Sequence, residues 1–80
     1  MTFNLPAFIR DGCAAAGIPG VLVGAVVHRA EMAMVAVQAR GRGRTREQRI
    51  AATPREVCKR VLAQAAADYA AGTLERRVEE

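Results

Sequence analysis

Aromatic residues are scarce in this 80-residue chain, which has Phe3, Phe8 and Tyr69 but no tryptophan. Its hydrophobic content of 51% is therefore mostly alanine and valine, which bury little apolar area each. A chain this short forms one domain, and it buries only about 60% of the surface that its unfolded form exposes. We therefore expect a single domain over residues 1–80 whose core is completed by dimerisation. The shortage of aromatics also excludes a stacking platform for single-stranded nucleic acid.

Groups for catalysis and for metal binding are also few. His28 is the only histidine, and Cys13 and Cys58 are far apart in the sequence. We therefore expect no metal, no cofactor, no catalytic residue and no enzyme activity. The first residues lack the basic and apolar regions of a secretory signal, so we expect a cytoplasmic protein with both cysteines reduced and buried. A disulfide that joins the first helix to the last is the alternative.

The first predicted helix is bounded by local signals. Asn4 is a good N-cap, and Pro6 fits the first turn, where its missing N–H costs nothing. Gly17 is a typical stop signal, so the pattern predicts a helix over about residues 5–16. Gly12 should weaken the middle of this helix.

The last predicted helix has the clearest start signal. Thr53 precedes Pro54, and Glu56 stands three residues after the threonine, which predicts a capping box and a helix over about 54–71. Its apolar residues recur at helical spacing from Val57 to Tyr69. The polar residues are expected to face away from that side: Arg55, Glu56, Lys59, Gln64 and Asp68. The tail, residues 73–80, is expected to be disordered or to form a loose extra turn.

The segment between them, 20–40, is predicted to be one long helix about 30 Å in length. Its valine-rich start leaves a strand over 20–28 as the alternative. The fold class is therefore all-α, a small bundle of about three helices. Length would allow the long helix to span a membrane, but central charges such as Arg29 and Glu31 cost roughly 2.5–3.5 kcal/mol each on insertion.

Two short amphipathic helices cannot cover a 30 Å apolar cylinder, so we expect a second copy to pack against the long helix. A close approach of helices is expected at the pair Gly20 and Gly24, because small residues let backbones meet. The alternative is that both glycines only fray the start of the helix. His28 and Glu31 share a helix face and are expected to form a polar contact that fixes the register of an interface. The predicted packing residues are Gly20, Gly24, Val26, His28, Glu31 and Val35.

An arginine-rich run follows the long helix and contributes to the net charge of +4. The predicted contact residues for a partner are Arg40, Arg42, Arg44, Arg46, Arg49, Arg55 and Lys59, and Arg60 extends the strip. The pentapeptide RGRGR, residues 40–44, resembles the core of an AT-hook, although no proline flanks it. That resemblance implies an arm that follows a phosphate backbone or enters the minor groove of DNA. Residues 45–64 also resemble a helix-turn-helix unit, but they lack its glycine turn.

From these observations we expect a small accessory protein, an adaptor or inhibitor that binds another protein and acts as a homodimer. The arginine run is then a solvated connector or a patch that meets an acidic protein surface. The alternative function is a DNA-binding regulator that uses the arginine-rich segment 40–60.

Overall fold

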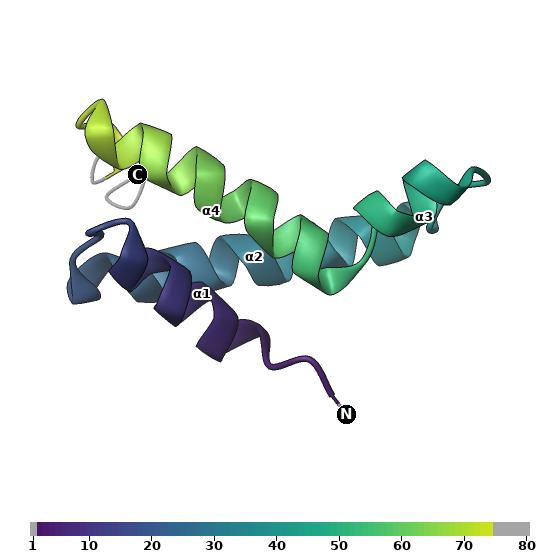
Figure 1. Ribbon diagram of the computed structural model, residues 1–80, viewed down its shortest axis with the longest axis horizontal. Helices are drawn as coiled ribbons and strands as arrows, with labels where there is room; N and C mark the ends of the chain where they lie inside the picture. Colours follow the sequence, from purple (N-terminus) through teal and green to yellow (C-terminus); the bar gives the residue numbers. More distant parts are fainter. Residues whose placement is uncertain (1, 75–80) are drawn as a thin grey trace.

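The chain folds entirely into helices within the part that the structure describes. The computed structural model describes residues 2–74, which form four α-helices and no strand: α1 (Leu5–Ala15), α2 (Gly20–Arg40), α3 (Arg46–Ala51) and α4 (Pro54–Ala70) (Figure 1). The predicted all-α bundle with three main helices is confirmed. The strand considered for residues 20–28 is wrong, because that segment forms the first part of α2.

Local capping explains where α1 begins and ends. The side chain of Asn4 accepts a hydrogen bond of 3.1 Å from the backbone N–H of Ala7. At the other end, Gly17 has a φ of +74°, which glycine adopts without the steric cost that a Cβ imposes. The N–H of Gly17 then bonds to the carbonyl of Ala14, and the N–H of Ile18 to that of Cys13, so two otherwise unpaired carbonyls are satisfied.

The core lies where α1 and α4 pack against one side of α2 and against each other (Figure 1). Helix α2 contributes Leu22, Val26 and Ala30, which recur every four residues and therefore share one face. The remaining core side chains are Ile9, Cys13, Ile18, Cys58, Val61, Ala65 and Leu74. Because most of these side chains are small or medium in size, the helices approach closely and the core is thin.

Both cysteines belong to this core. Cys13 and Cys58 are free thiols with no exposed surface, so the prediction that both are buried is confirmed. Burial raises the pKa of both thiols above the ordinary value of 9.0, because the thiolate would lose its hydration. The two residues therefore act as small hydrophobic side chains.

The prediction that Asp68 faces away from the core is wrong. Asp68 is only 6% exposed, and its carboxylate accepts hydrogen bonds from Gln64 at 3.0 Å and from Arg29 of α2 at 3.3 Å. A buried carboxylate needs such partners, because burial without them costs several kcal/mol. The ion pair with Arg29 joins α4 to α2 on the edge of the core.

The start of α4 is predicted correctly, but its capping is not. Thr53 occupies the N-cap position, yet its hydroxyl donates a 2.8 Å hydrogen bond to the carbonyl of Ile50 and makes no cap bond. The capping box in this region belongs to α3, where Thr45 and Gln48 bond reciprocally to each other's backbone N–H groups. The spacing Thr-x-x-Gln is present in the sequence and would have predicted it.

Of the predicted tail, residues 73–80, the structure describes only Thr73 and Leu74. Thr73 donates hydrogen bonds to the backbone carbonyl of Asp68 from its own N–H and hydroxyl, and Leu74 is buried. Residues 75–80 lie outside the described residues.

Candidate functional site

The side of α2 that α1 and α4 leave uncovered carries exposed apolar side chains. Val21, Met32 and Val35 are 87%, 53% and 55% exposed, respectively. We call this surface the outer face of α2 and define it by Val21, Gly24, His28, Glu31, Met32, Val35 and Gln38, all of which are exposed. The helix therefore has a buried side and a long open side. Large exposed apolar groups gathered on one element are typical of binding surfaces.

The structure separates residues that the sequence analysis grouped as packing residues. Val26 has no exposed surface and belongs to the core of its own chain, so it cannot contact a second copy directly. Val35 lies on the outer face. The difference arises because positions 26 and 35 are nine residues apart, which places them on opposite sides of a helix with 3.6 residues per turn.

The glycine and polar positions of the predicted interface lie on the same open side. Apart from the nearby backbone of α2 itself, no atom of the described residues lies within 4 Å of a Cβ built on Gly20 or Gly24, so neither α1, α3 nor α4 approaches them. Among the described residues, neither His28 nor Glu31 has a hydrogen-bond or ion-pair partner. A close helix contact and a polar contact at these positions would therefore need a second molecule, and both stay predictions. Met32 was missed, although it follows His28 by four residues and so shares its face.

Length and composition would allow α2 to cross a membrane. An 18-residue window of the helix has a mean hydropathy of 1.6, and 22% of that window is buried. The core helix of a soluble protein can pass the same test. Here Arg29 is paired with Asp68 of α4, and Glu31 lies near the middle of α2. Charges at these positions oppose insertion of this helix into a bilayer.

The arginine-rich segment is a folded projection at one end of the bundle (Figure 1). Helix α3 contacts α4 but not α2 within the described part of the chain. The side-chain oxygen of Gln48 accepts hydrogen bonds from the backbone N–H groups of Arg44 at 2.8 Å and Thr45 at 3.1 Å. The guanidinium of Arg49 donates to the carbonyl of Arg44 at 3.4 Å. The segment after α2 thus folds back on the start of α3.

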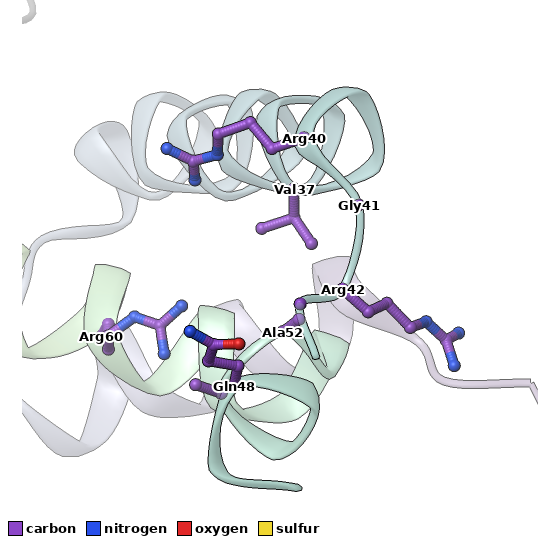
Figure 2. Close-up of a pocket in the computed structure, with 9 residues that line it drawn as sticks. Val37, Arg40, Gly41, Arg42, Gln48, Ala52 and Arg60 are labelled. Carbon is purple, nitrogen blue, oxygen red and sulfur yellow. The ribbon is translucent and has the colours of Figure 1, made fainter. Parts of the chain in front are cut away.

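A cleft of about 380 Å³ lies between the end of α2, α3 and α4. Arg40, Arg42 and Arg60 line it together with Gln48 over an apolar floor, and no acidic residue among residues 2–74 does. Figure 2 shows the guanidinium groups of Arg40 and Arg60 on the same side of the cleft, whereas Arg42 points away from it. The arginine side chains of this segment therefore do not all point in the same direction.

The predicted basic strip is divided in the fold. Arg55 stands over the ring of Phe8 at 5.9 Å from its centroid, which is a cation–π contact with α1. Lys59 pairs with Glu56 at 3.4 Å on the surface of α4. Arg44, Arg46 and Arg49 are exposed on the loop and α3, and no carboxylate among residues 2–74 pairs with them. Of the basic residues on α4, only Arg60 joins the cleft.

Within the described residues, no three histidine, cysteine or acidic side chains lie close enough together to hold a metal ion. The two exposed surfaces, the outer face of α2 and the arginine-rich segment, are the features that offer a binding function. No protein family, curated protein or solved structure matches the chain.

Proposed function

We propose that the chain is a small, non-enzymatic accessory protein, an adaptor or inhibitor that binds another protein and works as a homodimer. The observation that carries the proposal is the outer face of α2, where Val21, Met32 and Val35 remain exposed after the chain has folded. Burying a valine or methionine side chain contributes about 1.5–3 kcal/mol. In a symmetric dimer these side chains are buried in both copies. Their summed contribution is large compared with the free energy of unfolding of roughly 4–12 kcal/mol that is expected for an 80-residue chain.

The thinness of the molecule supports the same proposal. Its extents are 37 × 27 × 17 Å, and packed helices lie about 8–10 Å apart, so the bundle is two helices deep in its shortest direction. A second copy placed on the outer face would bury α2 between two layers. This arrangement gives the core the thickness that the chain alone does not provide.

A matched pair of substitutions on one helix tests the proposal. Val35→Asp places a charge on the outer face, whereas Val26→Asp places the same charge in the core. We expect the wild-type protein to be a dimer at micromolar concentration, Val35→Asp to be a folded monomer, and Val26→Asp to be unfolded. Light scattering after gel filtration gives the mass, and circular dichroism gives the helix content. A wild-type protein that is monomeric at tens of micromolar would contradict the proposal.

Binding of duplex DNA is the second candidate function. It is supported by the cleft, which Arg40, Arg42 and Arg60 line with no acidic residue from the described part of the chain, and by the exposed arginines beside it. Contacts with phosphate groups would release counterions, so such binding should weaken steeply as the salt concentration rises.

The variant in which Arg40, Arg42, Arg44 and Arg46 are all replaced by glutamine separates the two functions. If the segment is a connector or meets an acidic protein, the wild type should bind duplex DNA weakly, and the variant should fold and dimerise normally. Tight binding of wild type to duplex DNA at physiological salt, lost in the variant, would favour the DNA-binding function. The salt slope should then fall by nearly one unit for each lost phosphate contact.

A further inference from the structure

We infer that two copies of the chain pair with their α2 helices antiparallel, so that His28 of each copy lies beside Glu31 of the other. This inference rests on the proposed homodimer and specifies its geometry. It is carried by the order of side chains along the outer face, which becomes self-complementary only when one helix is reversed.

The outer face contains a seam with the spacing of helices packed side by side. Residues of the seam follow one another at alternating steps of three and four, and all six are exposed: Val21, Gly24, His28, Glu31, Val35 and Gln38. Alternating steps of three and four keep a stripe of residues facing a neighbouring helix over several turns. The seam runs along the middle of the open side, opposite the buried positions Leu22, Val26 and Ala30.

Reversal of one helix matches large residues with small ones and basic groups with acidic ones. With the twofold axis midway between His28 and Glu31, Gly24 faces Val35 of the partner subunit. Apart from the nearby backbone of α2 itself, a Cβ built on Gly24 meets no atom of the described residues within 4 Å, so the space for that valine side chain is open. The same axis places His28 opposite the partner's Glu31, where an imidazole N–H can donate to a carboxylate oxygen.

A parallel pair lacks this complementarity. It would place Glu31 against the partner subunit's Glu31, and like charges facing each other are destabilising. Gly24 would face the partner's Gly24 and Val35 the partner's Val35, so no large side chain would occupy the open space beside Gly24. The arginine-rich segments of both copies would also lie at the same end, which concentrates positive charge there.

The polar pair also selects the register of the antiparallel arrangement. A shift of about one helical turn puts His28 against the partner's His28 and Glu31 against the partner's Ala25. Both carboxylates are then left without a partner at the interface, and an unpaired charge that loses water is costly. Opposed His28 and Glu31 therefore set the alignment, as polar residues in helical seams can do.

Disulfide trapping with two single variants, Gly24→Cys and Val35→Cys, tests the geometry. Both positions are exposed, whereas the native Cys13 and Cys58 have no exposed surface and should not react. In the antiparallel pair, two thiols at the same position lie eleven residues out of register, or about 16 Å apart along the helix. A disulfide needs Cα atoms within about 7 Å, so neither variant alone should be trapped.

The two variants are mixed in equal amounts, left until their subunits exchange, and then mildly oxidised with copper phenanthroline. The mixture should give a disulfide-linked heterodimer. The two chains carry tags of different mass, and circular dichroism first shows that each is folded. Disulfide-linked homodimers of each variant alone would overturn the antiparallel orientation in favour of a parallel one. A dimeric mass in light scattering without any trapped species would overturn the seam itself. A wild-type protein that is monomeric in light scattering would refute the proposed dimer itself. In the other two outcomes the protein is a dimer and only the proposed geometry fails.

Discussion

Replacement of Gly12 by alanine is the most sensitive probe of how closely α1 and α4 approach. A Cβ added at Gly12 would lie 2.9 Å from one terminal methyl carbon of Leu62, closer still to the other, and 3.1 Å from the Cγ. Favourable carbon contacts begin at about 3.5 Å, so the leucine must move or the helices must separate. Gly12 is therefore a point of close packing, which helix propensity alone does not reveal.

Two opposing terms decide the sign of the effect. Alanine in place of a helical glycine stabilises the helix by about 1 kcal/mol. Overpacking in a packed region costs about 1–3 kcal/mol, and Leu62 is half-buried, so it has partial freedom to turn toward water. We expect Gly12→Ala to lower the free energy of unfolding by up to about 2 kcal/mol, which lowers the Tm by several degrees in a domain of this size.

A double-mutant cycle isolates the contact. Leu62→Ala removes the atoms that the new methyl group would meet, so Gly12→Ala in that background should stabilise the protein by about 1 kcal/mol. The reversal of sign between the two backgrounds is the diagnostic result. Urea unfolding should be followed by circular dichroism at one fixed protein concentration, because dimerisation makes the midpoint depend on concentration. If Gly12→Ala stabilises the protein even when Leu62 is present, the two helices do not approach as described.

Three further predictions concern single contacts of the fold. Thr45→Ala should destabilise α3 by about 1 kcal/mol, because the capping box of that helix is lost. Thr53→Ala should destabilise α4 by less, because Thr53 makes no cap bond. Amide hydrogen exchange in each helix compares the two losses of stability. Asp68→Ala should lower the free energy of unfolding by about 1–3 kcal/mol, because it leaves two donors without their acceptor; an unchanged urea midpoint would contradict this. Cys13 and Cys58 should react with a thiol reagent only as fast as the chain unfolds. Because burial raises their folded pKa above 9.0, stability should also fall as the pH rises above about 9, which urea midpoints at pH 8 and pH 10 will show.

The helices were predictable because the signals that bound them act over a few residues. Asn4 and Gly17 enclose α1, and Pro54 starts α4, since each restricts or caps the backbone next to it. The capping of α3 by Thr45 was a readable signal of the same kind. Capping preferences alone could not show whether Thr53 would cap its helix or bond to the preceding turn, because both arrangements suit a threonine in that position.

The candidate surfaces were predictable only in part. The sequence shows that a long apolar helix cannot be covered by two short ones, and this holds in the fold. It does not show which side stays open, so it cannot distinguish Val26, which is buried, from Val35, which is exposed. Whether the side chain of Asp68 faces solvent or Arg29 of α2 depends in the same way on where α2 lies beside α4.

The helical class, the positions of the three main helices and the excess of apolar surface on α2 can all be derived from the sequence. These follow from local backbone preferences and from the spacing of apolar residues. The packing of the helices, in contrast, places α1 and α4 on the same side of α2, brings Gly12 against Leu62, and puts Arg60 and Arg40 at the same cleft. Those relations join residues far apart in the chain, and they depend on how whole helices pack together.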